Sequence, residues 1–233
     1  PALRKPASAI LSGTVPGDGA PVAGEYPHNL FTLLGGAYDV HGGERITSLC
    51  PTSLCPVPDG VPVPDLVRDA EHIWRRTMTD TRGDPELIPA AFSDRSGVFT
   101  RWVDGQDFPG DAESDDAEAE PGGRPDLYVH HMLLPHARWE YLPDGTRYAG
   151  SDPPAGLFVA AWGAWGEDVA RQRHVLQAQA ADALLGGLLD RLEGDGVYDD
   201  ALVVVTADHG YAFDQGSPWR GADERNVDAK WLV

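Results

Sequence analysis

The stretch that most constrains the fold is residues 201–210, which read Ala-Leu-Val-Val-Val-Thr-Ala-Asp-His-Gly. Its three consecutive valines, 203–205, are typical of a strand buried on both faces of a parallel sheet. The run ends on Asp208 and His209, side chains that bind divalent metals, and on Gly210, which lets the backbone turn. Ligands of open α/β sheets bind beyond the carboxyl ends of the strands, so this strand end predicts a metal site.

A second strand candidate and a long helix precede this stretch. Residues 127–134 read as a buried strand that Pro135 breaks, and an amphipathic helix is predicted for about 168–192, with Gly194 and Gly196 ending it. The apolar residues near one face of this helix are Val169, Leu176, Ala180, Ala183, Leu184, Leu188 and Leu192. A strand–helix–strand crossover is right-handed and pairs its strands in parallel. We therefore expect an α/β fold with a mostly parallel central sheet flanked by helices.

The same crossover brings a histidine to the edge that carries Asp208. Pro135 turns His136 out over the carboxyl edge, whereas strand alternation sends His131 to one face of the sheet. By spacing alone, packed or surface histidines explain both positions. Beside Asp208, His136 is a better candidate for a functional residue than His131 or His130.

The first half of the chain is mixed. Asn29 opens a short helix, 29–34, that glycines end, and a further helix is predicted from residue 65 to about 78. Residues 37–40 and 45–49 read as strand material. Residues 110–124 are an acidic low-complexity stretch and are expected to form a solvated loop.

The two cysteines, Cys50 and Cys55, leave the choice between free thiols and a disulfide open. Four residues separate them, which permits a small disulfide loop if the protein lies outside the cytoplasm. Two cysteines are too few for a structural zinc site.

Length and charge exclude several classes. The chain has 233 residues, enough for one α/β core or one decorated domain, and a formal net charge of -19. Nucleic-acid binding needs basic patches, so we expect no nucleic-acid partner. No apolar run is long enough to predict a membrane span, and no signal-peptide pattern opens the sequence.

Six segments in order resemble the sulfatase branch of the alkaline phosphatase superfamily, and in particular membrane-anchored actinobacterial sulfatase-domain proteins. These segments are 8–13, 28–34, 47–51, 129–139, 171–177 and 203–210. The resemblance implies the family's three-layer α/β sandwich, present here in part, over residues 1–233. It also implies a location outside the cytoplasm, with membrane anchoring through parts of the protein beyond this chain.

The resemblance further implies nucleophilic attack on a sulfate or phosphate ester, either a small molecule or one linked to a glycan or lipid. Asp208 and His209 match the late ligands of the family's divalent metal, for which Ca, Mn, Mg and Zn all remain open. His136 matches a residue that contacts the transferred group or protonates the leaving oxygen, and His131 is a weaker match on the substrate side.

The family's early acidic ligand and its nucleophile have no counterpart here, because both precede the segment matched by 8–13. We therefore expect the chain to be truncated at both ends and inactive in isolation. The main alternative is a degenerate sulfatase-fold module with a binding or structural role in the cell envelope. A third reading, a phosphoglycerate mutase or nucleotide pyrophosphatase relative, needs a later histidine-containing metal motif, which is not found after Gly210.

Overall fold

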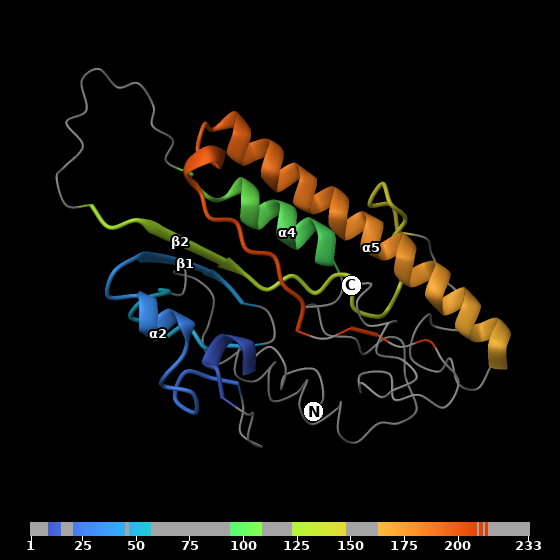
Figure 1. The fold of residues 1–233 in the computed structure, drawn as a ribbon, viewed down its shortest axis with the longest axis horizontal. Coiled ribbons are helices and arrows are strands. Elements are labelled where there is room, and N and C mark those ends of the chain that lie inside the picture. Colours follow the sequence, from blue (N-terminus) through green and yellow to red (C-terminus); the bar gives the residue numbers. More distant parts are fainter. Residues whose placement is uncertain are drawn as a thin grey trace. The chain divides into compact units, whose positions relative to one another are not determined.

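The computed structural model describes residues 9–14, 21–44, 47–56, 94–108, 123–147, 163–208, 210–211 and 213. Its elements in chain order are α2 (Leu30–Leu34), β1 (Asp39–Gly43), α4 (Arg95–Asp104), β2 (Asp126–His130), α5 (Gly163–Gly194) and the 3-10 helix η4 (Tyr198–Asp200) (Figure 1). The helix predicted at 65–78 lies outside the described residues, as does most of the acidic loop 110–124.

The chain divides into two compact units. The first unit comprises Pro1–Arg95 and Asp116–Met132, and the second comprises Ser96–Asp115 and Leu133–Val233. No helix among the described residues has both the length and the apolar character that crossing a bilayer requires.

The sheet of the first unit is a parallel pair of strands. β1 and β2 run in register from Asp39 opposite Asp126 to Gly43 opposite His130. The strands predicted at 37–40 and 127–134 are therefore confirmed in kind, and so is the α/β class with parallel pairing. β2 ends at His130, four residues before the predicted end, although the amide of His131 still donates to the Gly43 carbonyl at 2.9 Å.

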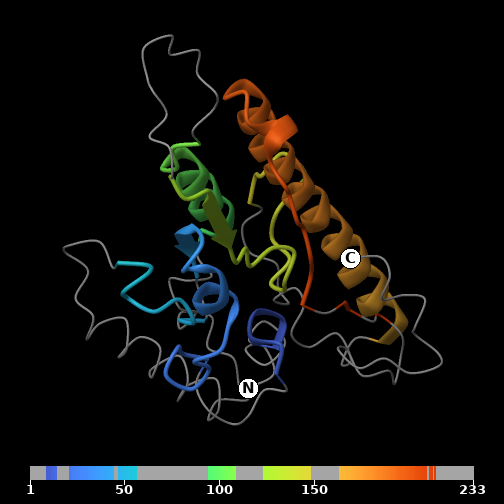
Figure 2. The same cartoon turned by 60° about the vertical axis from the view of Figure 1, so that its left-hand side comes forward.

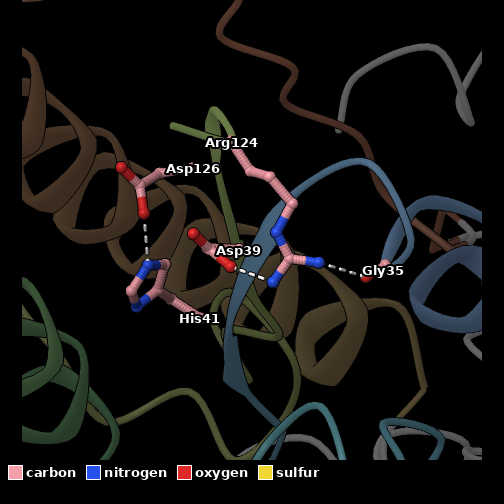
Figure 3. A network of polar contacts seen from close by, with 5 residues as sticks. All are labelled: Gly35, Asp39, His41, Arg124 and Asp126. Atoms are coloured by element: carbon pink, nitrogen blue, oxygen red, sulfur yellow. Dashed lines mark hydrogen bonds and ion pairs between the residues drawn. The ribbon is translucent and has the colours of Figure 1, made fainter. Parts of the chain in front are cut away.

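Polar side chains hold the start of this strand pair together (Figure 3). His41 Nε2 lies 2.6 Å from Asp126 Oδ1, and the His41 ring stacks on Tyr128 with ring centroids 4.5 Å apart. The Arg124 guanidinium pairs with Asp39 and donates to the Gly35 carbonyl at 3.2 Å. Both ion pairs join residues on or beside β1 to residues on or beside β2, so they fix the register across a long sequence separation.

Helix α2 begins at a buried N-cap. The Asn29 side-chain oxygen accepts from the amides of Phe31 and Thr32, at 2.9 and 3.1 Å, which satisfies two donors of the first turn. Its amide nitrogen donates to the carbonyls of Tyr26 and Leu49, at 2.8 and 2.9 Å. Asn29 thus ties the helix to a distant loop, and Phe31 and Leu49 are fully buried beside it.

That distant loop is closed by the Cys50–Cys55 disulfide. The Glu44 carboxylate accepts from the amides of Leu49 and Cys50, at 2.9 and 2.8 Å, and so fixes the entry to the loop. A Cβ placed on Gly42 of β1 would lie only 2.8 Å from Cys55 Sγ. The disulfide therefore packs closely on the strand where the strand has no side chain.

The second unit is built on α5, the long orange helix in Figures 1 and 2. The helix ends in the hydrogen-bond pattern of a Schellman motif, with the amides of Val197 and Gly196 donating to the carbonyls of Leu192 and Glu193. Gly196 has φ +73°, a conformation that glycine adopts without strain. The predicted helix and its glycine stop are confirmed.

The buried face of α5 differs in part from the predicted one. Ala180 and Leu192 are buried as expected, but Ala183 is exposed. The first half of the helix buries Ala170, His174 and Gln177, at helical spacing. Two polar residues therefore occupy the centre of the buried face.

The strand predicted at 203–205 is not formed. Residues 201–207 are exposed and in no strand, with Leu202 91 % and Val204 73 % exposed, so they do not form the predicted pairing with 127–134, and the sheet of the described residues consists of β1 and β2. A valine run favours extended backbone, but a strand also needs a neighbour for its ladder hydrogen bonds. Within the described part of the chain, no other strand pairs with this run.

The double role of Asn29 predicts a large effect of its removal. Asn29→Ala should lower the free energy of unfolding by about 2–4 kcal/mol, because it removes the cap and leaves buried carbonyls without a donor. Asn29→Ser keeps a capping oxygen, so it should lower the free energy of unfolding by less than Asn29→Ala does. The measurement is denaturant unfolding, with the exposed residue Leu33 changed to Ala as control. A loss for Asn29→Ala no larger than that of the control would contradict this account.

Candidate functional site

Gln177 of α5 anchors the loop that carries His136. Gln177 Nε2 donates to the carbonyls of Pro135 and His136, at 3.0 and 2.6 Å, and its Oε1 accepts from the Glu140 amide at 2.9 Å. The Gln177 side chain is fully buried. A buried carboxamide with donors and acceptor engaged is a specific and stable brace for a loop.

Trp139 is the second anchor of this loop. Its side chain is 1 % exposed, and its Nε1 donates to the Pro135 carbonyl at 3.1 Å. Two residues that follow Asp208 in the sequence pack on the Trp139 ring. The ring centroid of Tyr211 lies 5.2 Å from that of Trp139, and the centroid of Phe213 lies 5.5 Å from it. His174 of α5 lies edge-on to the same ring at 5.6 Å. These four residues form the aromatic cluster of the second unit.

The aromatic cluster brings the two predicted functional segments together. After η4 the chain reverses and runs in the direction opposite to α5, as the orange-red trace in Figures 1 and 2 shows, and Asp208 follows the exposed run 201–207. Asp208 is half-buried, three residues before Tyr211. Because Tyr211 touches both Trp139 and His174, the segment that carries Asp208 and the loop that carries His136 share one anchor on α5.

His136 itself is half-buried at the surface of this loop. Its Nδ1 contacts the Ala137 carbonyl oxygen. A carbonyl only accepts, so Nδ1 carries the hydrogen in this contact.

The other predicted site residues are placed as follows. His209 lies outside the described residues. His131 belongs to the first unit, half-buried at the end of β2, where its amide extends the strand ladder. The predicted substrate-side role of His131 stays a prediction.

A divalent metal fits the donor chemistry of Asp208, whose carboxylate oxygen is a ligand that Ca, Mg, Mn and Zn all accept. The described residues contain no group of three or more His, Cys, Asp or Glu arranged to hold a metal. Asp208 and His209 remain the predicted ligands, with one of the two outside the described part of the chain.

Gln177, His174 and Trp139 were not predicted as parts of the site, although the segments 129–139 and 171–177 that resemble the sulfatase family contain them. The periodicity of α5 predicts a buried face but does not tell a buried glutamine from an exposed one. The pattern that could have indicated them is the helical spacing of His174 and Gln177 with Ala170, which places two polar residues inside an otherwise apolar stripe. Buried polar residues of this kind need hydrogen-bond partners. The loop of Pro135 and His136 lies in no helix or strand, so its carbonyls are available to accept from them.

The pKa of His174 is lowered from the usual histidine value because the ring is buried, while a hydrogen bond with the Pro135 carbonyl opposes the shift. The neutral ring suits its place in the aromatic cluster, since a desolvated imidazolium is unfavourable there.

Comparison with known proteins gives one match. The sequence matches the family model described as Sulfatase over residues 112–230, just over half of the chain, and this range contains the loop of His136, all of α5 and Asp208. Neither a curated protein nor a solved structure matches the chain.

The lowered pKa of His174 predicts how stability depends on pH. Because the folded-state pKa lies below the unfolded-state value of about 6.5, the unfolded chain takes up the proton first and stability is lost as the pH falls below that value. The free energy of unfolding of the wild-type protein should decrease from pH 7.5 to pH 5.5. The decrease over the same range should be smaller for His174→Phe.

The measurement is denaturant unfolding at several pH values. His28→Gln, at an exposed histidine in the first unit, is the matched control and should keep the wild-type slope. An identical slope in His174→Phe and wild type would show that His174 is not the titrating group.

Proposed function

The chain belongs to the sulfatase family, and we propose that it is the part of a metal-dependent ester hydrolase that holds the late metal ligands and the acid–base histidine. The reaction is hydrolysis or transfer at a sulfate or phosphate ester by nucleophilic attack. The observation that supports this most directly is the shared anchor on α5, where Trp139 packs on Tyr211 and holds the Pro135 carbonyl. This places the segment of Asp208 and the loop of His136 in one packed unit.

In this proposal Asp208 and His209 hold the divalent metal. A bound divalent metal polarises the ester oxygens and lowers the pKa of a nucleophile. His136 contacts the transferred group and gives a proton from Nε2 to the leaving oxygen. Its Nδ1–H contact with the Ala137 carbonyl keeps that nitrogen from exchanging roles with Nε2.

The substrate class and the location belong to the same proposal. We expect a small sulfate or phosphate ester, or one linked to a glycan or lipid. The Cys50–Cys55 disulfide supports a location outside the cytoplasm, because disulfides persist in oxidising compartments. Membrane anchoring through parts of the protein beyond this chain follows from the family resemblance alone.

The metal assignment is tested by changing both ligands. Asp208→Ala with His209→Ala should remove bound divalent metal and lower hydrolysis of aryl sulfates and aryl phosphates by at least about 100-fold. The control is Asp199→Ala with Asp200→Ala, two exposed acids of η4. Metal content is measured by elemental analysis. The 233-residue chain and a version extended upstream of Pro1 are both assayed, because the nucleophile is expected upstream.

Stoichiometric metal and activity in the extended protein, both lost in the double variant, would establish the ester hydrolase. A folded extended protein with neither would contradict it and leave the degenerate binding module.

The role of His136 is tested separately. His136→Gln should lower kcat by about 100-fold or more while metal content stays at the wild-type level. It should also abolish the alkaline limb of the pH–rate profile, which reports loss of the proton donor. A kcat within a few-fold of wild type would remove His136 from the reaction.

A further inference from the structure

Gln177 contacts the loop of His136 on both sides of the histidine. Its two donor hydrogens bind the carbonyl before His136 and the carbonyl of His136 itself, and its oxygen binds the Glu140 amide beyond it. Every hydrogen-bonding atom of the carboxamide is thus directed at a single stretch of six residues, 135–140.

The burial of Gln177 makes this arrangement rigid. The side chain has no exposed surface, in contrast with Gln172 and Gln179 of the same helix, which are exposed. Breaking any hydrogen bond of a buried carboxamide destabilises the protein, because no water replaces the lost partner. An aliphatic side chain of similar size would fill the same space without holding the loop in one conformation.

The link from Gln177 to the His136 ring passes through the backbone. The His136 carbonyl is fixed by Gln177, and the ring Nδ1 contacts the next carbonyl, that of Ala137. Gln177 fixes the peptide planes on both sides of the His136 Cα, through the Pro135 and His136 carbonyls, and the Nδ1 contact restricts the side-chain torsions of His136 relative to them. The position of Nε2 therefore depends on the Gln177 carboxamide.

We propose that Gln177 is a positioning residue that sets the orientation and protonation behaviour of His136. The inference rests on the proposed function for its kinetic consequence, but its structural part can be measured without turnover. His174 and Trp139 also bind the Pro135 carbonyl, so Gln177 is the group whose bonds extend past Pro135 to the histidine itself.

The structural test is NMR of the histidine side chains in the 233-residue protein. The ring signal of His136, assigned by its loss in His136→Gln, is titrated in wild type, Gln177→Met and Gln177→Glu. Met keeps the length of the side chain without hydrogen bonds, and Glu keeps the acceptor and loses the donors. Gln179→Glu, an exposed change on the same helix, is the matched control.

Both Gln177 variants should shift or split the His136 signal and move its titration midpoint, while Gln179→Glu leaves both unchanged. A folded Gln177→Met or Gln177→Glu protein with wild-type His136 signal and midpoint overturns the proposal. Two variants are used so that a failure of one to fold leaves the other informative.

The kinetic test is a double-mutant cycle in the upstream-extended protein. Gln177→Met should lower kcat by about 100-fold with little change in KM, because misplacing a catalytic group by about 1 Å has an effect of this size. In a His136→Gln background the same change should have almost no further effect. Independent, multiplicative effects would show a general structural role and overturn the proposal.

The two arms separate the possible failures. Upstream-extended wild-type protein without ester hydrolysis contradicts the proposed function, and the NMR arm then decides the positioning role alone. Hydrolysis that survives His136→Gln removes His136 from the chemistry, and a moved His136 signal would still establish that Gln177 positions the ring.

Discussion

The buried bonds between the Gln177 carboxamide and the backbone of residues 135–140 are the constraint on which the second unit depends. They fix a loop that has no regular secondary structure of its own to a helix that does. Trp139, held by the same loop, then packs Tyr211 and Phe213, and these residues locate the segment that carries Asp208. A polar interaction inside a helix face thereby brings together two segments that lie far apart in the sequence, residues 135–140 and the segment that carries Asp208.

Local sequence patterns predicted the elements that local interactions stabilise. The apolar periodicity and terminal glycines of α5 gave a helix because capping and face burial act within a few turns, and Asn29 marked the start of α2 for the same reason. The β2 strand was predictable from its own apolar run. Its partner was not, because β1 lies more than 80 residues away in the sequence and the contacts between the strands, such as His41 with Asp126, are encoded by no local pattern.

The candidate site residues can be named from the sequence, but the arrangement that brings their segments together cannot. Asp208 and His136 stand out because of their residue types beside a valine run and a proline, whereas the predicted sheet that was to unite them is not formed at residues 201–207. What unites them is packing on α5, through Trp139 and His174, and the order of contacts in a packed core is set by volumes and angles rather than by periodicity. The match to the sulfatase family model includes both segments, and it does not depend on how the fold brings them together.

The close contact between Gly42 and the disulfide has an evolutionary consequence. The sulfur atoms occupy the space that a side chain of β1 would fill, so the cystine serves the strand as a substitute side chain. A relative with any larger residue at this position would have no room for the cystine, and a relative without the cysteines would leave a void above the glycine. Glycine and the cysteine pair should therefore be inherited together and lost together.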